Sequence, residues 1–123
     1  MIMQVHHVSL VVADTERALA FYRDVMGLAV EPARPDLGFP GAWLTLEGGA
    51  QIHLLELPNP DPVTGRPAHG GRDRHLALTV ADLDALVAAL DRARVPFTRS
   101  RSGRRALFCR DPDGNALELI ERA

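Results

Sequence analysis

The sequence contains no lysine, and all 14 of its basic residues are arginine. This absence excludes Schiff-base catalysis by lysine and the P-loop of nucleotide-binding proteins, since both need that side chain. The single cysteine, Cys109, excludes an internal disulfide framework and is compatible with a reducing compartment. No apolar run approaches the about 18 residues of a transmembrane helix, and the first residues lack the features of a signal peptide. We therefore expect a cytoplasmic protein with no membrane-spanning segment.

The bulk composition is that of an ordinary globular domain. The 123 residues suit one domain with a modest core, and 46% of them are apolar and 24% charged. A net charge of -2 gives no electrostatic reason to expect binding to nucleic acid or to an anionic membrane. We expect neither of these as a partner.

The chain contains two similar halves. The segment His7-Val-Ser-Leu-Val-Val-Ala-Asp14 reads against His75-Leu-Ala-Leu-Thr-Val-Ala-Asp82. In each, an apolar, β-branched strand is followed by an acidic residue suited to cap a helix. Apolar residues then recur at helical spacing, which predicts helices at about 15–26 and 83–94.

Each half offers three further short strands between glycine- and proline-containing turns. They are expected near 28–33, 42–47 and 50–57 in the first half, and near 97–101, 104–110 and 115–121 in the second. The proline- and glycine-rich stretch 58–73 is interpreted as a linker. Because about 57 residues is thin for a self-sufficient core, we predict one α+β domain, 1–123, built from two βαβββ modules at about 1–57 and 74–123.

The closing strands of the two halves also correspond, with a small insertion or deletion between them. His53 falls on the position of Glu118, just as His7 falls on that of His75. Strand residues alternate between faces, and the residues that share a face with each histidine of the first strands are mostly small or polar. The alternate positions are apolar and suit packing under a helix. Superposing the halves would therefore bring all four candidates onto one concave sheet.

Three imidazoles and a carboxylate together suit a divalent ion such as Zn²⁺, Ni²⁺, Co²⁺, Mn²⁺ or Fe²⁺. A lone strand histidine is more often structural, but two histidines repeated in register with a carboxylate on the same face argue against that explanation. We predict that His7, His53, His75 and Glu118 bind one such ion. Structural roles are expected for His6, on the other face, and for His69, in the linker.

Four motifs run along the chain: His7-Val-Ser-Leu, Phe21-Tyr-Arg-Asp-Val-Met-Gly-Leu28, His75-Leu-Ala-Leu and Asp111-Pro-Asp-Gly-Asn-Ala-Leu-Glu118. In these the chain resembles the vicinal oxygen chelate superfamily, which includes glyoxalase I, fosfomycin thiol transferases, extradiol dioxygenases, methylmalonyl-CoA epimerase and bleomycin-resistance proteins. The resemblance implies a cupped, incomplete barrel of two modules, commonly in a homodimer, with the metal ligands at the four positions predicted above. It also implies a small-molecule substrate whose vicinal oxygens chelate the metal, which stabilises an oxyanion or enediolate.

Three activities remain open. The first is metal-dependent isomerase or lyase chemistry, with Glu118 as ligand and proton shuttle; it is not expected to be glutathione-dependent glyoxalase I, because His53 replaces a glutamate and Val11 and Leu57 replace polar contacts. The second is an Fe(II) extradiol-type dioxygenase, with His53 as ligand or acid–base, although a tyrosine is expected near Phe108. The third is a non-enzymatic protein that binds a small molecule or confers resistance.

The remaining notable residues have a simpler interpretation. A run of arginines is usually a solvated strand edge, but it can also contact an anion at the mouth of a cavity. Cys109 has no adjacent base and is expected to pack rather than to react. Trp43 is expected to lie partly in the core and partly on a cavity wall. The arginines of the run are Arg99, Arg101, Arg104 and Arg105.

Overall fold

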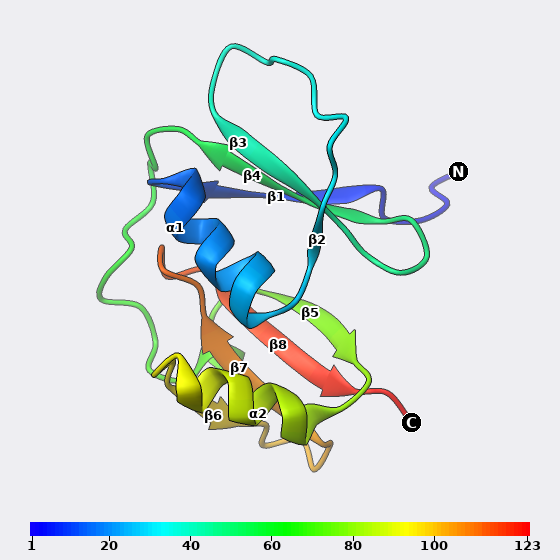
Figure 1. The fold of residues 1–123 in the computed structure, drawn as a ribbon. Helices are drawn as coiled ribbons and strands as arrows, with labels where there is room; N and C mark the ends of the chain where they lie inside the picture. Colours follow the sequence, from blue (N-terminus) through cyan, green and yellow to red (C-terminus); the bar gives the residue numbers. More distant parts are fainter. The chain divides into compact units, whose positions relative to one another are not determined.

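A computed structural model describes residues 1–123, in two compact units, Met1–Asp61 and Pro62–Ala123. The first unit contains β1 (His7–Val12), α1 (Thr15–Leu19), a π-helical continuation (Ala20–Val25), β2 (Ala29–Val30), β3 (Gly41–Thr45) and β4 (Gln51–Glu56). The second contains a short 3₁₀ turn (Gly70–Arg72), β5 (His75–Val80), α2 (Leu83–Arg92), β6 (Phe97–Arg99), β7 (Ala106–Arg110) and β8 (Ala116–Glu121). Each unit is thus a βαβββ module, as predicted (Figure 1).

The two sheets have the same topology. Their strand orders are β1-β4-β3-β2 and β5-β8-β7-β6, and in each the first and last strands are parallel while the other pairs are antiparallel. Ser9 pairs with His53 and Ala77 with Glu118, so the register repeats as well. The sheets are open, mixed and four-stranded, which confirms the predicted α+β class and the internal repeat.

Both helices begin in the same way. Asp14 accepts a hydrogen bond from the Arg17 backbone N–H, and Asp82 accepts one from that of Ala85, which satisfies donors that a helix start leaves unpaired. A glutamate from the last strand of the module adds a second cap, since Glu56 accepts from the backbone of Thr15 and Glu121 from that of Leu83, at 2.8 and 2.9 Å. These caps fix each helix against its own sheet, with α1 against β4 and α2 against β8.

Each unit has its own apolar core, in which α1 or α2 covers one face of the sheet. The other face of β5 is more open: along this strand exposed residues alternate with half-buried ones, and His75, Ala77 and Thr79 are exposed. The predicted division into a packed face and an open face therefore holds for this strand. The largest fully buried side chains are Val12, Tyr22, Leu44, Ile52 and Leu54 in the first unit, and Leu83, Leu90, Leu107, Leu117 and Leu119 in the second.

The two largest departures from the predicted elements lie in the first unit. The first helix is α-helical only to Leu19, because the Met26 backbone N–H donates to the Phe21 carbonyl, five residues back, at 2.9 Å. The strand expected at 28–33 shrinks to Ala29–Val30, since Pro32 interrupts it and proline has no N–H to donate to a neighbour. No helix of the protein is both long and apolar enough to cross a bilayer.

Candidate metal centre

His75 and Glu118 meet on neighbouring strands of the second sheet. The Nε2 atom of His75 lies 3.4 Å from Oε1 of Glu118. Glu118 is 4% exposed, so its carboxylate is buried beside a polar partner rather than in solvent. Two ligands of a tetrahedral zinc site, with bonds of about 2.0–2.1 Å, lie about 3.3 Å apart. The pair therefore has the spacing of two ligands of one ion.

The other nitrogen of His75 has a partner that fixes the protonation of the ring. Nδ1 lies 2.9 Å from the backbone carbonyl oxygen of Asp73, which can only accept, so Nδ1 carries the proton. In the neutral ring the lone pair is therefore on Nε2, the atom that faces Glu118. A histidine held through its second nitrogen in this way is typical of metal sites, because the contact sets both the tautomer and the ring orientation.

Asp73 itself is held firmly in place. Arg66 donates to both of its carboxylate oxygens at 2.8 Å, and Arg110 donates to Oδ2 at 2.8 Å. The hydrogen bonds from these guanidinium groups hold the pKa of Asp73 far below its usual value. The carbonyl that orients His75 thus belongs to a residue locked by three charge-assisted hydrogen bonds.

The second oxygen of Glu118 also has a charged partner. Arg104 donates from Nη2 to Oε2 at 2.9 Å, while its Nε donates to the Ser102 hydroxyl at 3.1 Å. Oε1 is left to face His75. One oxygen of the Glu118 carboxylate therefore contacts an arginine, and the other faces the candidate ligand His75.

The first unit brings His7 and His53 together. Their rings stack with centroids 4.0 Å apart, and Trp43 stacks on the other side of His53 at 4.3 Å. Trp43 pairs with His53 across β3 and β4, which explains why the two rings share a face. The indole thus forms a wall of this site.

Hydrogen bonds also select the atoms of His7 and His53 that could bind metal. Nε2 of His53 lies 2.9 Å from Oε1 of Gln51, so it donates and leaves the lone pair on Nδ1. Nδ1 of His7 is 2.8 Å from Nδ1 of His6, which leaves Nε2 of His7 as its candidate ligand atom. Burial, followed by the influence of His7, His6 and Arg34, lowers the pKa of His53. Its neutral form, the form that binds metal or accepts a proton, is therefore favoured.

The four predicted ligands form two pairs, one in each compact unit. No group of three or more His, Cys, Asp and Glu side chains in the structure is arranged to hold a metal ion. Within each pair, the donor types and the hydrogen bonds that fix them suit a divalent ion. The assembly of the two pairs around one ion stays a prediction.

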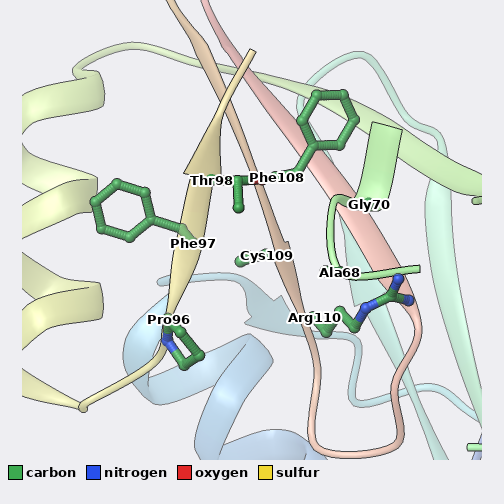
Figure 2. A pocket seen from close by; sticks show the side chains of 8 residues that line it. All are labelled: Ala68, Gly70, Pro96, Phe97, Thr98, Phe108, Cys109 and Arg110. Atoms are coloured by element: carbon green, nitrogen blue, oxygen red, sulfur yellow. The ribbon is translucent and has the colours of Figure 1, made fainter. Parts of the chain in front are cut away.

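A pocket of about 160 Å³ lies in the second unit and is lined in part by residues of β6 and β7 (Figure 2). Phe108 from this pocket has its ring edge-on to His75 at 5.0 Å and edge-on to His69 at 4.9 Å, so one aromatic ring separates the pocket from the candidate ligand. The polar groups of the wall are engaged: the Thr98 hydroxyl lies 2.6 Å from His69, and Arg110 is held by Asp73. The lining residues are Ala68, Gly70, Pro96, Phe97, Thr98, Phe108, Cys109 and Arg110.

The structure assigns a role to the cysteine and to two of the arginines noted in the sequence. Cys109 is buried, and burial raises the pKa of its thiol to about 12, so it packs as expected. Arg105 bridges Glu121 and Asp84, as an arginine on a strand edge would. Sequence reasoning did not find the contact of Arg104 with Glu118. The alternation of strand residues could not reveal it, because Arg104 lies in the turn before β7.

The amino-acid sequence is similar to known proteins along nearly its whole length. Residues 4–119 match the model of the Glyoxalase/Bleomycin resistance protein/Dioxygenase superfamily. The uncharacterized protein YaeR of Escherichia coli is 35% identical, over 97% of this chain and 96% of that protein. The lactoylglutathione lyase of Haemophilus influenzae is 31% identical, over 97% of this chain and 93% of the enzyme.

Solved structures share the fold. A Bacillus anthracis protein assigned to the glyoxalase family superposes with a TM-score of 0.81 at 23% identity, over 100% of this chain and 98% of that chain. At this identity the likeness speaks for the fold alone. The predicted two-module architecture is therefore also that of a solved protein.

Proposed function

The chain belongs to the glyoxalase/bleomycin resistance protein/dioxygenase superfamily, and we propose that it is a divalent-metal-dependent enzyme with isomerase or lyase chemistry on a small oxygenated substrate. His7, His53, His75 and Glu118 would hold the ion. When bound, the ion supplies a Lewis acid that polarises vicinal substrate oxygens and stabilises the resulting oxyanion. Relatives named lactoylglutathione lyase and methylmalonyl-CoA epimerase support this class of reaction.

The contact between His75 and Glu118 carries the proposal. A carboxylate that is buried and 3.4 Å from an imidazole nitrogen with a fixed lone pair has the donor types and spacing of a metal site. Burying a carboxylate is costly unless it has charged or metal partners. Arg104 supplies one such partner on Oε2, and a bound ion would supply the other beside His75.

The protein would move a proton through His53 or Glu118. In this role His53 would not bind the ion at the same time: burial favours its neutral form, and the lone pair on Nδ1 is suited to accept a proton from a carbon beside a substrate carbonyl. Trp43 stacks on its ring and keeps it in one orientation. Glu118 is the alternative proton carrier, through Oε1 when that atom does not hold the ion; Oε2 is engaged by Arg104.

The ring-cleaving alternative receives less support. Phe108 stands edge-on to His75 on the open face of the second sheet, and its side chain has no proton to give. An acid or base for that chemistry would therefore have to be His53 alone. A homodimer is proposed as the working assembly, because each open sheet leaves strand edges unpaired.

Two measurements test the proposal. Metal analysis of protein purified without added metal or chelator is expected to give about one divalent ion per chain. Zinc, nickel or cobalt would favour the isomerase or lyase, and oxygen-sensitive Fe²⁺ the dioxygenase. Protein that neither carries nor binds any of these ions would contradict the proposal and favour a binding protein.

The second measurement follows the proton. NMR in D₂O should show loss of the hydrogen beside the carbonyl in one or more small α-hydroxy carbonyl compounds when wild type is added. Loss of a general base typically slows such a step by about 10²–10⁴-fold, so His53→Ala or Glu118→Gln should abolish the exchange. Equal exchange in both variants and wild type would reject these catalytic roles.

A further inference from the structure

Among the arginines of the 99–105 run, Arg104 occupies a distinct position. Arg99 lies over the ring of Phe97, at 5.4 Å from its centroid, and Arg105 is engaged by Glu121 and Asp84. Arg104 instead reaches the candidate metal ligand Glu118. It is thus the cation of this run that lies at the site.

Arg104 extends from a buried carboxylate to solvent. The Glu118 side chain is 5% exposed, whereas that of Arg104 is 56% exposed. Two of its three nitrogens are engaged, Nη2 by Glu118 and Nε by the Ser102 hydroxyl. No hydrogen bond engages Nη1, so its two N–H groups remain available to a ligand, and a guanidinium stays charged at any physiological pH.

The turn that carries Arg104 holds it in this position. The Ser100 and Ser102 hydroxyls lie 2.8 Å apart, and the backbone of Ser102 donates to Ser100. Gly103 has a φ of 85°, a conformation that other residues adopt only with strain, and it turns the chain between Ser102 and Arg104. The guanidinium is therefore placed by a short, internally bonded turn, so its direction is defined before any ligand arrives.

Further positive charge gathers on the same face of the sheet. Thr98, Phe108 and Glu118 lie side by side across β6, β7 and β8. His69 contacts Thr98 at one end of this row, and burial together with the charges of Arg101 and Arg72 lowers its pKa. Neither Arg101 nor Arg72 forms an ion pair. Their charges act on His69 at this face and would add to the attraction that Arg104 exerts on an anion.

We propose that Arg104 binds an anionic group of the substrate, so that the substrate is a small carboxylate or phosphate compound whose vicinal oxygens face Glu118. The inference rests on the proposed metal function and adds the substrate class. A guanidinium matches the paired oxygens of carboxylate and phosphate, and the Arg104 side chain that reaches buried Glu118 is itself 56% exposed. The guanidinium of Arg104 would thus donate to Glu118 through Nη2 and to the anionic group of the substrate through Nη1.

Two hydroxamates test this assignment, because they share the chelating oxygens and differ in the added anion. Acetohydroxamate carries only the vicinal oxygens, whereas phosphoglycolohydroxamate carries the same oxygens and a phosphate. Their Kd values are measured calorimetrically on protein saturated with Zn²⁺, for wild type, Arg104→Gln and Arg104→Lys. Arg105→Gln is the matched control, since it removes the same charge from a residue engaged elsewhere.

Wild type should bind the phosphate compound more tightly than acetohydroxamate. A hydrogen bond to a charged group is worth about 1.5–3 kcal/mol, so Arg104→Gln should reduce this preference about tenfold or more. Arg104→Lys should keep part of it, and Arg105→Gln all of it. Taking the ratio of the two Kd values removes any general effect of Arg104 on the metal or on Glu118.

The outcomes separate the two proposals. A preference that is unchanged in Arg104→Gln, or reduced equally in Arg105→Gln, would overturn the anion assignment and leave the metal function standing. If wild type binds the two hydroxamates equally well, the anion assignment is likewise overturned and the metal function still stands. If wild type binds neither Zn²⁺ nor acetohydroxamate, the proposed function fails, and the substrate assignment falls with it.

Discussion

Nε2 of His75 lies 3.4 Å from Oε1 of Glu118, while the outer atoms of both residues are held by other groups. The distance exceeds the usual range of a good hydrogen bond, about 2.7–3.2 Å, but matches the spacing of two ligands on one ion. The Asp73 carbonyl accepts from His75, and Arg104 donates to Glu118. The two facing atoms are thus the ones left for a cation.

Asp73 is predicted to stabilise the second unit strongly. Replacing it by Asn would leave Arg66 and Arg110 without their carboxylate partner, and the side chain of Asp73 is only 9% exposed. We expect Asp73→Asn to lower the free energy of unfolding by about 2–3 kcal/mol at pH 7, measured by urea denaturation.

The control is the pH dependence of the difference in unfolding free energy between wild type and Asp73→Asn. Because the pKa of Asp73 is lower in the folded than in the unfolded protein, its contribution is fully present above the unfolded value and is lost as the pH falls below it. The gap between wild type and Asp73→Asn should therefore narrow below about pH 4. A gap that stays constant from pH 7 to pH 3 would contradict the assigned role.

Arg94 is predicted to be a strained position. It follows α2 with a φ of 57°, where the first helix is followed by Gly27 with a φ of 80°. A non-glycine residue there costs about 1–2 kcal/mol, part of which glycine loses again in the unfolded state. Arg94→Gly should raise the free energy of unfolding by up to about 1 kcal/mol. Arg92→Gly, inside the helix, is the control and should lower it; equal destabilisation by both variants would contradict the prediction.

The assembly prediction concerns the strand edges. β1 and β2 border the first sheet, and β5 and β6 border the second, so each unit offers backbone groups for pairing. We expect light scattering to give the mass of a homodimer at high micromolar concentration. A monomeric mass under these conditions would count against it.

The fourth prediction concerns glutathione. His53 occupies the position where a glutamate is expected for glyoxalase I, and Val11 and Leu57 carry no polar group. We therefore expect poor turnover of the hemithioacetal of methylglyoxal and glutathione, despite 31% identity to a lactoylglutathione lyase. A turnover number within the usual enzyme range of about 1–10³ s⁻¹ in a spectrophotometric assay would overturn this expectation.

The internal repeat could be predicted from the sequence because its signals, a strand followed by a helix cap, lie close together within each half. Asp14 and Asp82 each follow a β-branched strand, and both cap a helix as their position indicates. The alternation of strand residues predicted which side chains share a face, so the side-chain contact between His75 and Glu118 could be expected. The π-helical segment could not, since it depends on which carbonyl the Met26 N–H finds once the helix packs.

The surroundings of the site were less accessible to sequence reasoning. The contacts of Arg104, Asp73 and Trp43 depend on side-chain directions across strands and turns rather than on spacing along one element. The predicted division of the chain, with a linker at 58–73, gave no sign that Asp73 anchors Arg66 and Arg110. These residues orient the candidate ligands without resembling ligands themselves.

We propose that the repeated histidines and Glu118 bind one divalent ion. Calorimetric titration of Zn²⁺ into chelator-treated protein tests it, using wild type, His7→Ala, His75→Ala and Glu118→Gln. His69→Ala is the control, because that histidine lies outside the proposed ligand set and contacts Thr98. His53→Ala is added to rank the ligands.

Wild type and His69→Ala should each bind about one ion per chain, with the same affinity. Loss of a ligand should weaken binding by more than about tenfold in His7→Ala, His75→Ala and Glu118→Gln, since loss of even an outer partner typically costs 10–100-fold. His53→Ala should weaken it less. Equal affinity for Zn²⁺ in all of these proteins would contradict the metal centre and, with it, the proposed enzyme.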